Sequence, residues 1–290
     1  MKKILLTGAS GLLGLNFYLQ NKKFIIKPLI HKKKINLINS DKLDLLNFTK
    51  LNNIIEKFKP DIILHTAALT DVDKCEQNKN LATNLNINIT KNLVEVSKLY
   101  NLKLIFISTD QLFKKNRNYF KESDRPNPVN FYAKTKKISE DIIKKKLRNY
   151  LIIRTNFFGW GTKYKKSFSD RIIESLRNNK VIQLFDDVYF NPVSIDFLCK
   201  IINKLIIKEA YGTFNISSNL SISKYQFGII ISKVFKLNQK LIVPINLSDK
   251  KIIKRPLFMS LSNKKLVKTL KISSKQLNIF KQINDLKKYS

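Results

Sequence analysis

The sequence predicts an α/β protein built on a doubly wound parallel sheet, and three observations support this fold class. Short apolar runs alternate with amphipathic helical patterns through the first half of the 290 residues. A glycine-rich turn follows the first apolar run, and the second half mixes short strands with helices. Alternating strands and helices favour parallel βαβ units with right-handed crossovers. We therefore expect a Rossmann-type sheet with a smaller, interleaved α/β substrate-binding lobe.

The first half divides into strands and helices by apolar periodicity and by the positions of Gly and Pro. The predicted strands cover residues 3–7, 24–30, 61–65, 103–108 and 149–154. The predicted helices cover residues 11–20, 48–58, 81–99 and about 131–147. The third helix is a single long amphipathic one, with apolar residues at helical spacing from Leu85 to Val96.

The second half is expected to hold the smaller lobe. Strands are predicted at residues 181–184 and 213–216, and helices near 168–176, 195–207 and 224–235. An apolar segment at 241–243 precedes Pro244, and a Lys-rich tail follows. We expect a dinucleotide-binding domain over 1–155 with a returning segment of about 187–212, and a substrate-binding lobe over 156–186 and 213–290.

The charge of +34 comes from 48 Lys and seven Arg scattered along the chain. A nucleic-acid binder is one alternative, but Arg is the better residue for bidentate phosphate contacts and no nucleic-acid motif is present. We interpret the charge as a solvated surface and expect no nucleic-acid partner. No apolar run reaches the ~18–20 residues of a membrane helix, so no membrane partner is expected either. Cys75 and Cys199 form no metal-spaced pair or disulfide framework, which favours a reducing cytoplasm.

Gly8, Gly11 and Gly14 lie between the first strand and the first helix. The first allows a tight turn, the second lets backbone N–H groups approach a pyrophosphate, and the third lets the helix and strand pack closely. The helix N-terminus adds a positive dipole for the phosphates. The chain has only seven glycines, and three of them are here. The alternative is a structural turn without a ligand.

The end of the second strand predicts which nicotinamide cofactor binds. In NAD-binding proteins an acidic residue there contacts the ribose 2′-hydroxyl. This chain instead has His31, Lys32, Lys33 and Lys34. Cationic side chains suit a 2′-phosphate, so we predict NADPH, with NADH as the alternative if these are simply exposed residues.

Tyr132 and Lys136 are the predicted catalytic pair. They lie four apart in a helical segment and therefore on one face. A Tyr with a pKa of ~10 is a poor acid–base catalyst at neutral pH, and a nearby ammonium lowers that pKa. Composition alone produces such pairs by chance, and Tyr18 with Lys22 is another, inside the first helix. Thr109 at the exit of the fourth strand could hydrogen-bond a substrate carbonyl beside Tyr132.

Several motifs together resemble the dTDP-4-dehydrorhamnose reductases, a family of extended short-chain dehydrogenases/reductases. The resemblance begins at the Gly8–Gly11–Gly14 spacing and continues through the segments 65–76 and 108–113, the 126–128 and 132–136 segment, Arg154-Thr155 and Arg255-Pro256. Asn86 and Asn92-Leu93 resemble the family's next helix. The resemblance covers nearly the whole chain.

The resemblance implies reduction of the 4-keto group of a nucleotide-linked 6-deoxy sugar, for surface polysaccharide synthesis. Tyr132 would protonate the developing alkoxide, Lys136 would hold the nicotinamide ribose, and Thr109 would orient the carbonyl. The implied cofactor-binding residues are Gly8, Ser10, Gly11, Leu12, Gly14, His31, Lys32, Asp44, Leu45, Ala67, Ala68, Tyr132 and Lys136. The implied substrate-binding residues are Thr70, Asp110, Phe157 and Arg255, and no metal is expected. Relatives of this kind commonly form homodimers.

The chain departs from the family pattern near the expected sugar pocket. Gln111 replaces a usual Tyr, Asn156 and Phe157 stand where a Trp is usual, and Ile89 replaces a Gly. Two alternatives therefore stay open: another extended short-chain enzyme such as a nucleotide-sugar 4-epimerase or epimerase-reductase, and a non-catalytic NADP-binding subunit. We interpret His65, at a strand end, as a hydrogen-bonded structural residue near the cofactor, and His31 as exposed.

Overall fold

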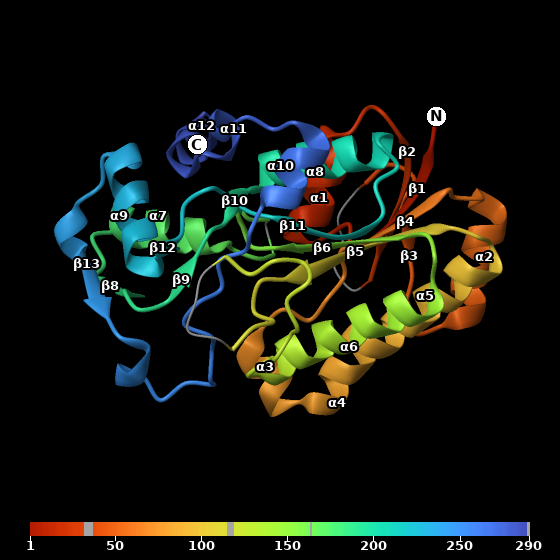
Figure 1. Ribbon diagram of the computed structural model, residues 1–290, viewed down its shortest axis with the longest axis horizontal. Helices are drawn as coiled ribbons and strands as arrows, with labels where there is room; N and C mark the ends of the chain where they lie inside the picture. The colour runs from red at the N-terminus through yellow and green to blue at the C-terminus, as the bar shows by residue number, and fades with distance from the viewer. Residues whose placement is uncertain (32–36, 115–118, 163, 289–290) are drawn as a thin grey trace. The chain divides into compact units, whose positions relative to one another are not determined.

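The computed structural model describes residues 1–31, 37–114, 119–162 and 164–288 (Figure 1). Lys32 and its neighbours Lys33 and Lys34, predicted to meet a 2′-phosphate, lie outside the described residues. The chain forms two compact units. Unit 1 consists of Met1–Ser108, Asn130–Ile153 and Glu209–Thr213, and unit 2 consists of Thr109–Val129, Arg154–Lys208 and Phe214–Ser290.

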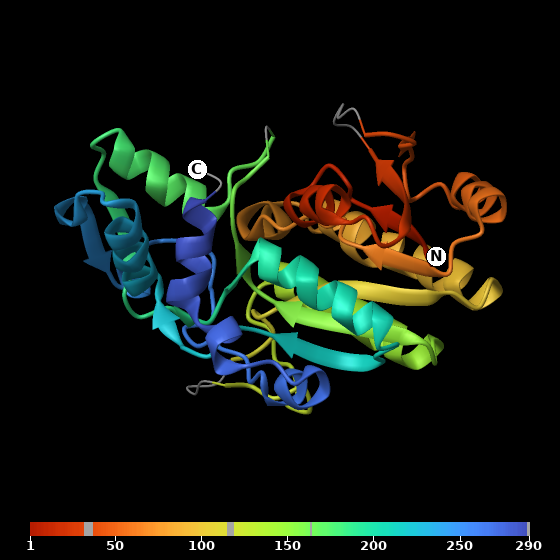
Figure 2. The ribbon, with the colours of Figure 1, turned by 90° about the horizontal axis from the view of Figure 1, so that it is seen from above.

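A seven-stranded sheet is the framework of unit 1. Its strands are β1 (Lys3–Thr7), β2 (Ile25–Ile30), β3 (Asp41–Lys42), β4 (Ile62–His65), β5 (Lys103–Thr109), β6 (Tyr150–Thr155) and β11 (Gly212–Ile216). They are ordered β11-β6-β5-β4-β1-β2-β3, and Figure 2 shows them side by side. β1 pairs in parallel with β2 and β4, β2 with β3, and β4 with β5. The predicted α/β fold class is confirmed. Three of these strands end in unit 2, which includes the last residue of β5, the last two of β6 and the last three of β11.

Helices cover both faces of this sheet within unit 1. These helices are α1 (Leu12–Gln20), α2 (Phe48–Phe58), α3 (Val72–Gln77), α4 (Lys79–Ala82), α5 (Ile89–Leu99) and α6 (Phe131–Lys146). α2, α5 and α6 lie on one face and α1 on the other (Figure 1). Leu51, Leu93 and Ile143 from these helices pack against strand residues such as Ile63 and Leu104, which forms the core of unit 1.

The helix predicted over 81–99 is present, but it is not α-helical throughout. A π-helix, Thr83–Asn88, separates α4 from α5, and the Ile89 N–H bonds the Asn84 carbonyl five residues back. The hydroxyls of Thr90 and Ser139 donate to the Asn86 carbonyl at 2.7 and 2.9 Å. Because these hydroxyls occupy that carbonyl, it is less available for the usual α-helical bond, and the wider turn results.

Unit 2 contains three two-stranded sheets and several helices. Its strand pairs are β7 (Phe157–Phe158) with β10 (Val193–Ser194), β8 (Ile182–Phe185) with β13 (Ile242–Ile245), and β9 (Tyr189–Phe190) with β12 (Ile222–Ser223). Its helices are α7 (Phe168–Arg177), α8 (Ile195–Ile207), α9 (Lys224–Phe235), α10 (Lys264–Leu270), α11 (Ser274–Leu277) and α12 (Ile279–Lys287), with 3₁₀ turns at Gln239–Leu241 and Leu247–Asp249. Phe158, Phe190 and Phe227 lie in its core, and Trp160 packs against Phe235. Among its described residues, the Lys-rich tail is helical only in α10, α11, α12 and the 3₁₀ turn at Leu247–Asp249.

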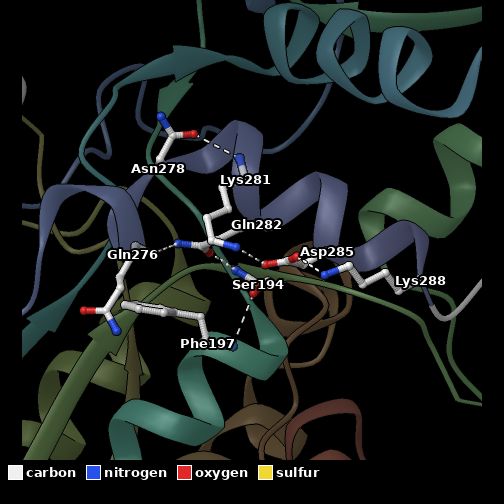
Figure 3. A network of polar contacts seen from close by, with 8 residues as sticks. All are labelled: Ser194, Phe197, Gln276, Asn278, Lys281, Gln282, Asp285 and Lys288. Carbon is white, nitrogen blue, oxygen red and sulfur yellow. Dashed lines mark hydrogen bonds and ion pairs between the residues drawn. The ribbon is translucent and has the colours of Figure 1, made fainter.

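A buried amide attaches the C-terminal helix to unit 2 (Figure 3). The Oε1 atom of Gln282 on α12 accepts a hydrogen bond from the Ser194 N–H at 2.6 Å, and its Nε2 donates to the Gln276 carbonyl at 3.0 Å. Ser194 also caps α8, and Asn278 caps α12. One side chain thus joins the start of α8 to the end of the chain.

The two units differ from the predicted domain boundaries mainly in two segments. Residues 109–129 and 187–208 belong to unit 2, whereas the prediction assigned them to the dinucleotide-binding domain. In the first segment, Leu112, Phe113 and Phe120 pack against Leu261. In the second, Asn191 exchanges hydrogen bonds with Leu261 at 2.8 and 2.9 Å. Packing against a distant part of the chain cannot be read from local periodicity. The functional boundaries stay a prediction.

Candidate functional site

The turn after β1 has the backbone geometry that the glycine pattern predicts. Gly8 has a φ of +70°, and a Cβ there would lie 2.6 Å from the Ala67 nitrogen. A Cβ on Gly14 would overlap the Gly8 carbonyl oxygen and lie 2.9 Å from the Ala9 Cα. Gly11 is the N-cap of α1, which has no side-chain cap. The first N–H groups of α1, from Leu12 onward, are therefore left for a ligand, and they suit an anion.

A cavity of about 170 Å³ in unit 1 gathers five of the predicted cofactor residues. Its lining consists of His31, Asp44, Leu45, Ala67 and Ala68, with Leu43, Leu85 and Ile89 completing it. Asn92 on α5 donates to the Leu45 and Leu46 carbonyls at 3.0 and 3.2 Å, which holds one wall in place. The sequence did not indicate that Leu85 and Ile89 face a cavity, because an apolar helix face looks the same when it is core.

α6 presents the predicted catalytic pair. Tyr132 and Lys136 lie one turn apart and are both buried. The helix begins with Asn130, whose side chain accepts from the Ala133 N–H at 2.9 Å. The Phe131 N–H donates to Glu76 at 2.9 Å, which attaches the start of α6 to α3. Both groups are therefore held on a fixed element, as catalysis requires.

The Asn86 side chain in the π-helix is hydrogen-bonded to α6 and to the loop after β4. Its amide donates to the Thr135 hydroxyl at 3.0 Å and exchanges two hydrogen bonds with the backbone of Leu69, at 2.8 and 3.1 Å. The Thr135 hydroxyl in turn donates to the Tyr132 carbonyl at 2.7 Å. The π-helix thus links the loop after β4 to the turn that carries Tyr132.

Lys136 has an unusual environment for a lysine. Its Nζ lies 3.9 Å from the centroid of the Phe106 ring on β5. Burial lowers the pKa of Lys136 to about 7, although Glu140 opposes the shift. The ammonium is consequently only partly protonated at neutral pH, and a neighbouring anion would favour its charged form.

His65 is a buried structural residue, as the sequence predicts. Its Nδ1 lies 2.7 Å from the Thr7 hydroxyl, so the ends of β4 and β1 are joined by this bond. Burial, and secondarily the charge of Lys136, lower the pKa of His65 to about 3, so the ring is neutral at physiological pH. His31 is exposed at the end of β2, also as predicted.

Thr109, Asp110 and Asn156 form a hydrogen-bonded group in unit 2. The Thr109 hydroxyl donates to Asp110 Oδ1 at 3.2 Å and accepts from the Gln111 N–H at 3.2 Å. The Asn156 amide donates to Asp110 Oδ2 at 2.8 Å. Thr109 belongs to a different unit from Tyr132 and Lys136, so its position beside Tyr132 stays a prediction.

A cavity of about 730 Å³ in unit 2 is lined by Arg255, one of the four predicted substrate residues. Lys114, Lys254 and the apolar side chains of Ile252, Ile253 and Phe258 also line it. Phe157 lies half-buried in β7, and Thr70 is exposed in unit 1 between β4 and α3. Asp187 adds one carboxylate to the lining, but the three cationic side chains exceed it, and with the apolar walls they suit a molecule with phosphates and a base.

Within residues 1–31, 37–114, 119–162 and 164–288, no group of three or more His, Cys, Asp or Glu side chains could hold a metal ion. No helix in those ranges is long and apolar enough to cross a membrane. Both cysteines are free and buried, and burial raises the pKa of Cys75 to about 11, so this thiol is unreactive at neutral pH.

Fold and site together define an extended short-chain dehydrogenase/reductase. The chain belongs to the RmlD substrate binding domain family, whose model matches residues 1–285. The dTDP-4-dehydrorhamnose reductase of Aggregatibacter actinomycetemcomitans is 27% identical over 241 residues, which are 80% of this chain and 78% of that protein. Methionine adenosyltransferase 2 subunit beta of Bos taurus is 26% identical over 265 residues, 84% of this chain and 75% of that protein.

A solved structure superposes on this chain over its full length. The dTDP-4-dehydrorhamnose reductase of Bacillus anthracis in complex with NADP superposes with a TM-score of 0.88 and 25% identity, covering 100% of both chains. The predicted family and fold class are confirmed. The reductase relatives are oxidoreductases, the class predicted for this chain, and the Bacillus anthracis protein holds the predicted cofactor.

Proposed function

We propose that this chain is an NADPH-dependent reductase of the 4-keto group of a nucleotide-linked 6-deoxy sugar, as in dTDP-rhamnose synthesis for a surface polysaccharide. The observation that carries the proposal is the pair Tyr132 and Lys136, buried one turn apart on the braced helix α6. Burying a lysine costs folding free energy, because burial disfavours its charged form, so a buried lysine indicates a functional role. Relatives named as dTDP-4-dehydrorhamnose reductases support the same reaction.

The residues of unit 1 fit a dinucleotide. The space at Gly8 and Gly14, the uncapped start of α1 and the cavity beside Asp44 and Ala67 would hold its phosphates and its adenosine end. Exposed His31 at the rim of that cavity suits the 2′-phosphate of NADPH. The bound cofactor supplies the hydride that is added to C4 of the sugar.

The chain's own residues manage the proton and the position of the carbonyl. The Tyr132 hydroxyl donates its proton to the C4 oxygen, which becomes the hydroxyl of the product. Protonated Lys136 favours the phenolate that remains and holds the nicotinamide ribose. Thr109 orients the carbonyl. Since its hydroxyl donates to Asp110 in the structure, it must rotate to donate to substrate. The cavity with Arg255, Lys254 and Lys114 would receive the nucleotide diphosphate. We place the reaction in the cytoplasm.

The test is NADPH absorbance after addition of enzymatically generated dTDP-4-keto-6-deoxy-L-lyxo-hexose. Wild type should consume NADPH, and Tyr132→Phe, which keeps the ring but loses the proton, should lose most of that activity. If Tyr132→Phe turned over at the wild-type rate, the catalytic assignment would be wrong. Epimerisation without net NADPH loss would favour the epimerase alternative.

A second candidate is a non-catalytic NADP-binding subunit. The observation that favours it is the similarity to methionine adenosyltransferase 2 subunit beta, at 26% identity over 265 residues. This function predicts tight NADPH binding, measured by nicotinamide fluorescence, with no turnover of any 4-keto nucleotide sugar. It also predicts that Tyr132→Phe leaves the chain's function unchanged.

A further inference from the structure

Lys224 is a cation at a helix N-terminus, a position where a positive charge is unfavourable. It is the first residue of α9, whose N-cap is Ser223 in a capping box with Gln226. The positive end of the helix macrodipole lies at this terminus, where acidic side chains are favoured and cations are not. A sequence that violates a local rule in this way commonly does so at a functional position.

The Lys224 side chain turns onto aromatic rings in unit 2. Its Nζ lies 3.2 Å from the centroid of Phe190 and 5.0 Å from that of Phe168. In the described part of the chain the ammonium makes no ion pair within 4 Å and donates no hydrogen bond. Burial lowers the pKa of Lys224 to about 7, and the nearby Asp110 carboxyl opposes this shift. The rings hold the amine in place while its three N–H donors stay available.

Asp110 supplies the complementary acceptor. It is 2% exposed, and its two oxygens accept one hydrogen bond each, from Asn156 and Thr109. A carboxylate has about four lone-pair sites, so further acceptor capacity remains. Burial raises the pKa of Asp110, and the charge of Lys224 opposes the shift most strongly. The two groups therefore interact electrostatically, and within the described residues no ion pair within 4 Å joins them.

We propose that Lys224 and Asp110 form a hydroxyl-binding pair for the sugar ring, with the ammonium donating to one hydroxyl oxygen and the carboxylate accepting from a neighbouring hydroxyl. The proposal rests on the proposed function, since it takes a sugar nucleotide as the substrate. A phosphate would satisfy Lys224 equally well, but the Asp110 carboxylate would repel it. A neutral diol uses both groups, and Thr109 connects the pair to the predicted position of the reacting carbonyl.

This assignment makes Lys224 a specificity-determining residue. A sugar that lacks the matching hydroxyl leaves the desolvated Lys224 amine without an acceptor, and sites built to hydrogen-bond a hydroxyl reject such a ligand strongly. The nucleotide part of the ligand is not involved. Loss of Lys224 should therefore weaken binding of the sugar and leave binding of the nucleotide alone unchanged.

The experiment compares the dissociation constants of dTDP-L-rhamnose and of dTDP by isothermal titration calorimetry. The variants are wild type, Lys224→Met and Lys224→Gln, which keeps N–H donors without the charge. Lys233→Met is the matched control, because Lys233 is an exposed lysine on the same helix. Melting curves check that each variant is folded, and Lys224→Gln replaces Lys224→Met if the latter is not.

We expect Lys224→Met to raise the dissociation constant of dTDP-L-rhamnose at least tenfold, as for a lost hydrogen bond to a charged group. The dissociation constant of dTDP should stay within twofold of the wild-type value. Lys224→Gln should fall between, and Lys233→Met should match wild type. Equal weakening of both ligands would overturn the proposal in favour of a phosphate contact, and no weakening would overturn it outright. Failure of wild type to bind dTDP-L-rhamnose would instead refute the proposed function itself.

Discussion

The buried amine of Lys136 should make the stability of this protein rise with pH. Its pKa is about 7 in the folded chain against an ordinary value of 10.5. Between these values the unfolded chain binds a proton that the folded chain does not. The free energy of unfolding therefore increases with pH across this window, by up to about 1.4 kcal/mol per pH unit. Over the whole interval the contribution is on the order of 5 kcal/mol.

Replacing Lys136 by Met removes the titrating group and keeps most of the side-chain volume. We expect Lys136→Met to be more stable than wild type near pH 7.5 and to lose this advantage progressively up to pH 9.5. The difference between the two proteins should change by about 2–3 kcal/mol over these two pH units. Lys224 titrates in the same window, but it is present in both proteins and cancels in the difference.

The assay is urea unfolding followed by far-UV circular dichroism at pH 7.5, 8.5 and 9.5. Lys134→Met is the control, because Lys134 is exposed on the same helix and should keep the wild-type slope. Parallel pH dependences for wild type and Lys136→Met would refute the reasoning. That result would mean that Lys136 stays protonated inside the folded protein, with solvent or a neighbouring charge compensating its burial.

Three further substitutions test a close glycine contact and two buried amides that stabilise the fold. Gly14→Ala places a Cβ against the Gly8 carbonyl and should reduce NADPH affinity at least tenfold, measured by fluorescence titration, with a lower melting temperature. An unchanged affinity would mean that α1 can shift without disturbing the turn. Asn86→Ala removes a buried amide that makes three hydrogen bonds, so it should lower the free energy of unfolding in urea by about 2–4 kcal/mol. The control Asn88→Ala, at a partly exposed π-helix position, should lower it by less than about 1 kcal/mol. Gln282→Leu leaves the Ser194 N–H without its acceptor and should lower the free energy of unfolding by about 1–3 kcal/mol; a neutral result would show that water replaces the amide.

Local chemistry determined how much could be predicted from the sequence. The turn at Gly8 and Gly14 was predictable because steric demands at a strand-to-helix turn act over a few residues. Five residues around the 170 Å³ cavity were named as cofactor-binding residues because the resemblance to the reductase family implied them. The π-helix was not predictable, since it depends on the Ser139 hydroxyl, 53 positions away, reaching the Asn86 carbonyl.

Lys224 illustrates a different limit. In a chain with 48 lysines, one more lysine carries no signal by its identity. The sequence hint was its place directly after the Ser of a Ser–x–x–Gln helix start, where a cation is unfavourable. What sets Lys224 apart from the other lysines is seen in the structure, where its amine lies on the Phe190 ring and interacts electrostatically with Asp110.

The position of β11 has a consequence for synthesis on the ribosome. This edge strand of the unit 1 sheet follows β6 in space but is separated from it by more than fifty residues of unit 2. Until residues 209–213 leave the exit tunnel, β6 is an open edge with unpaired backbone groups, and the buried Lys103 amine lacks its acceptor, the Ala210 carbonyl. The nascent first unit therefore cannot complete its sheet until more than three-quarters of the chain has been made. A chaperone or rapid translation through this stretch would protect that exposed edge from aggregation.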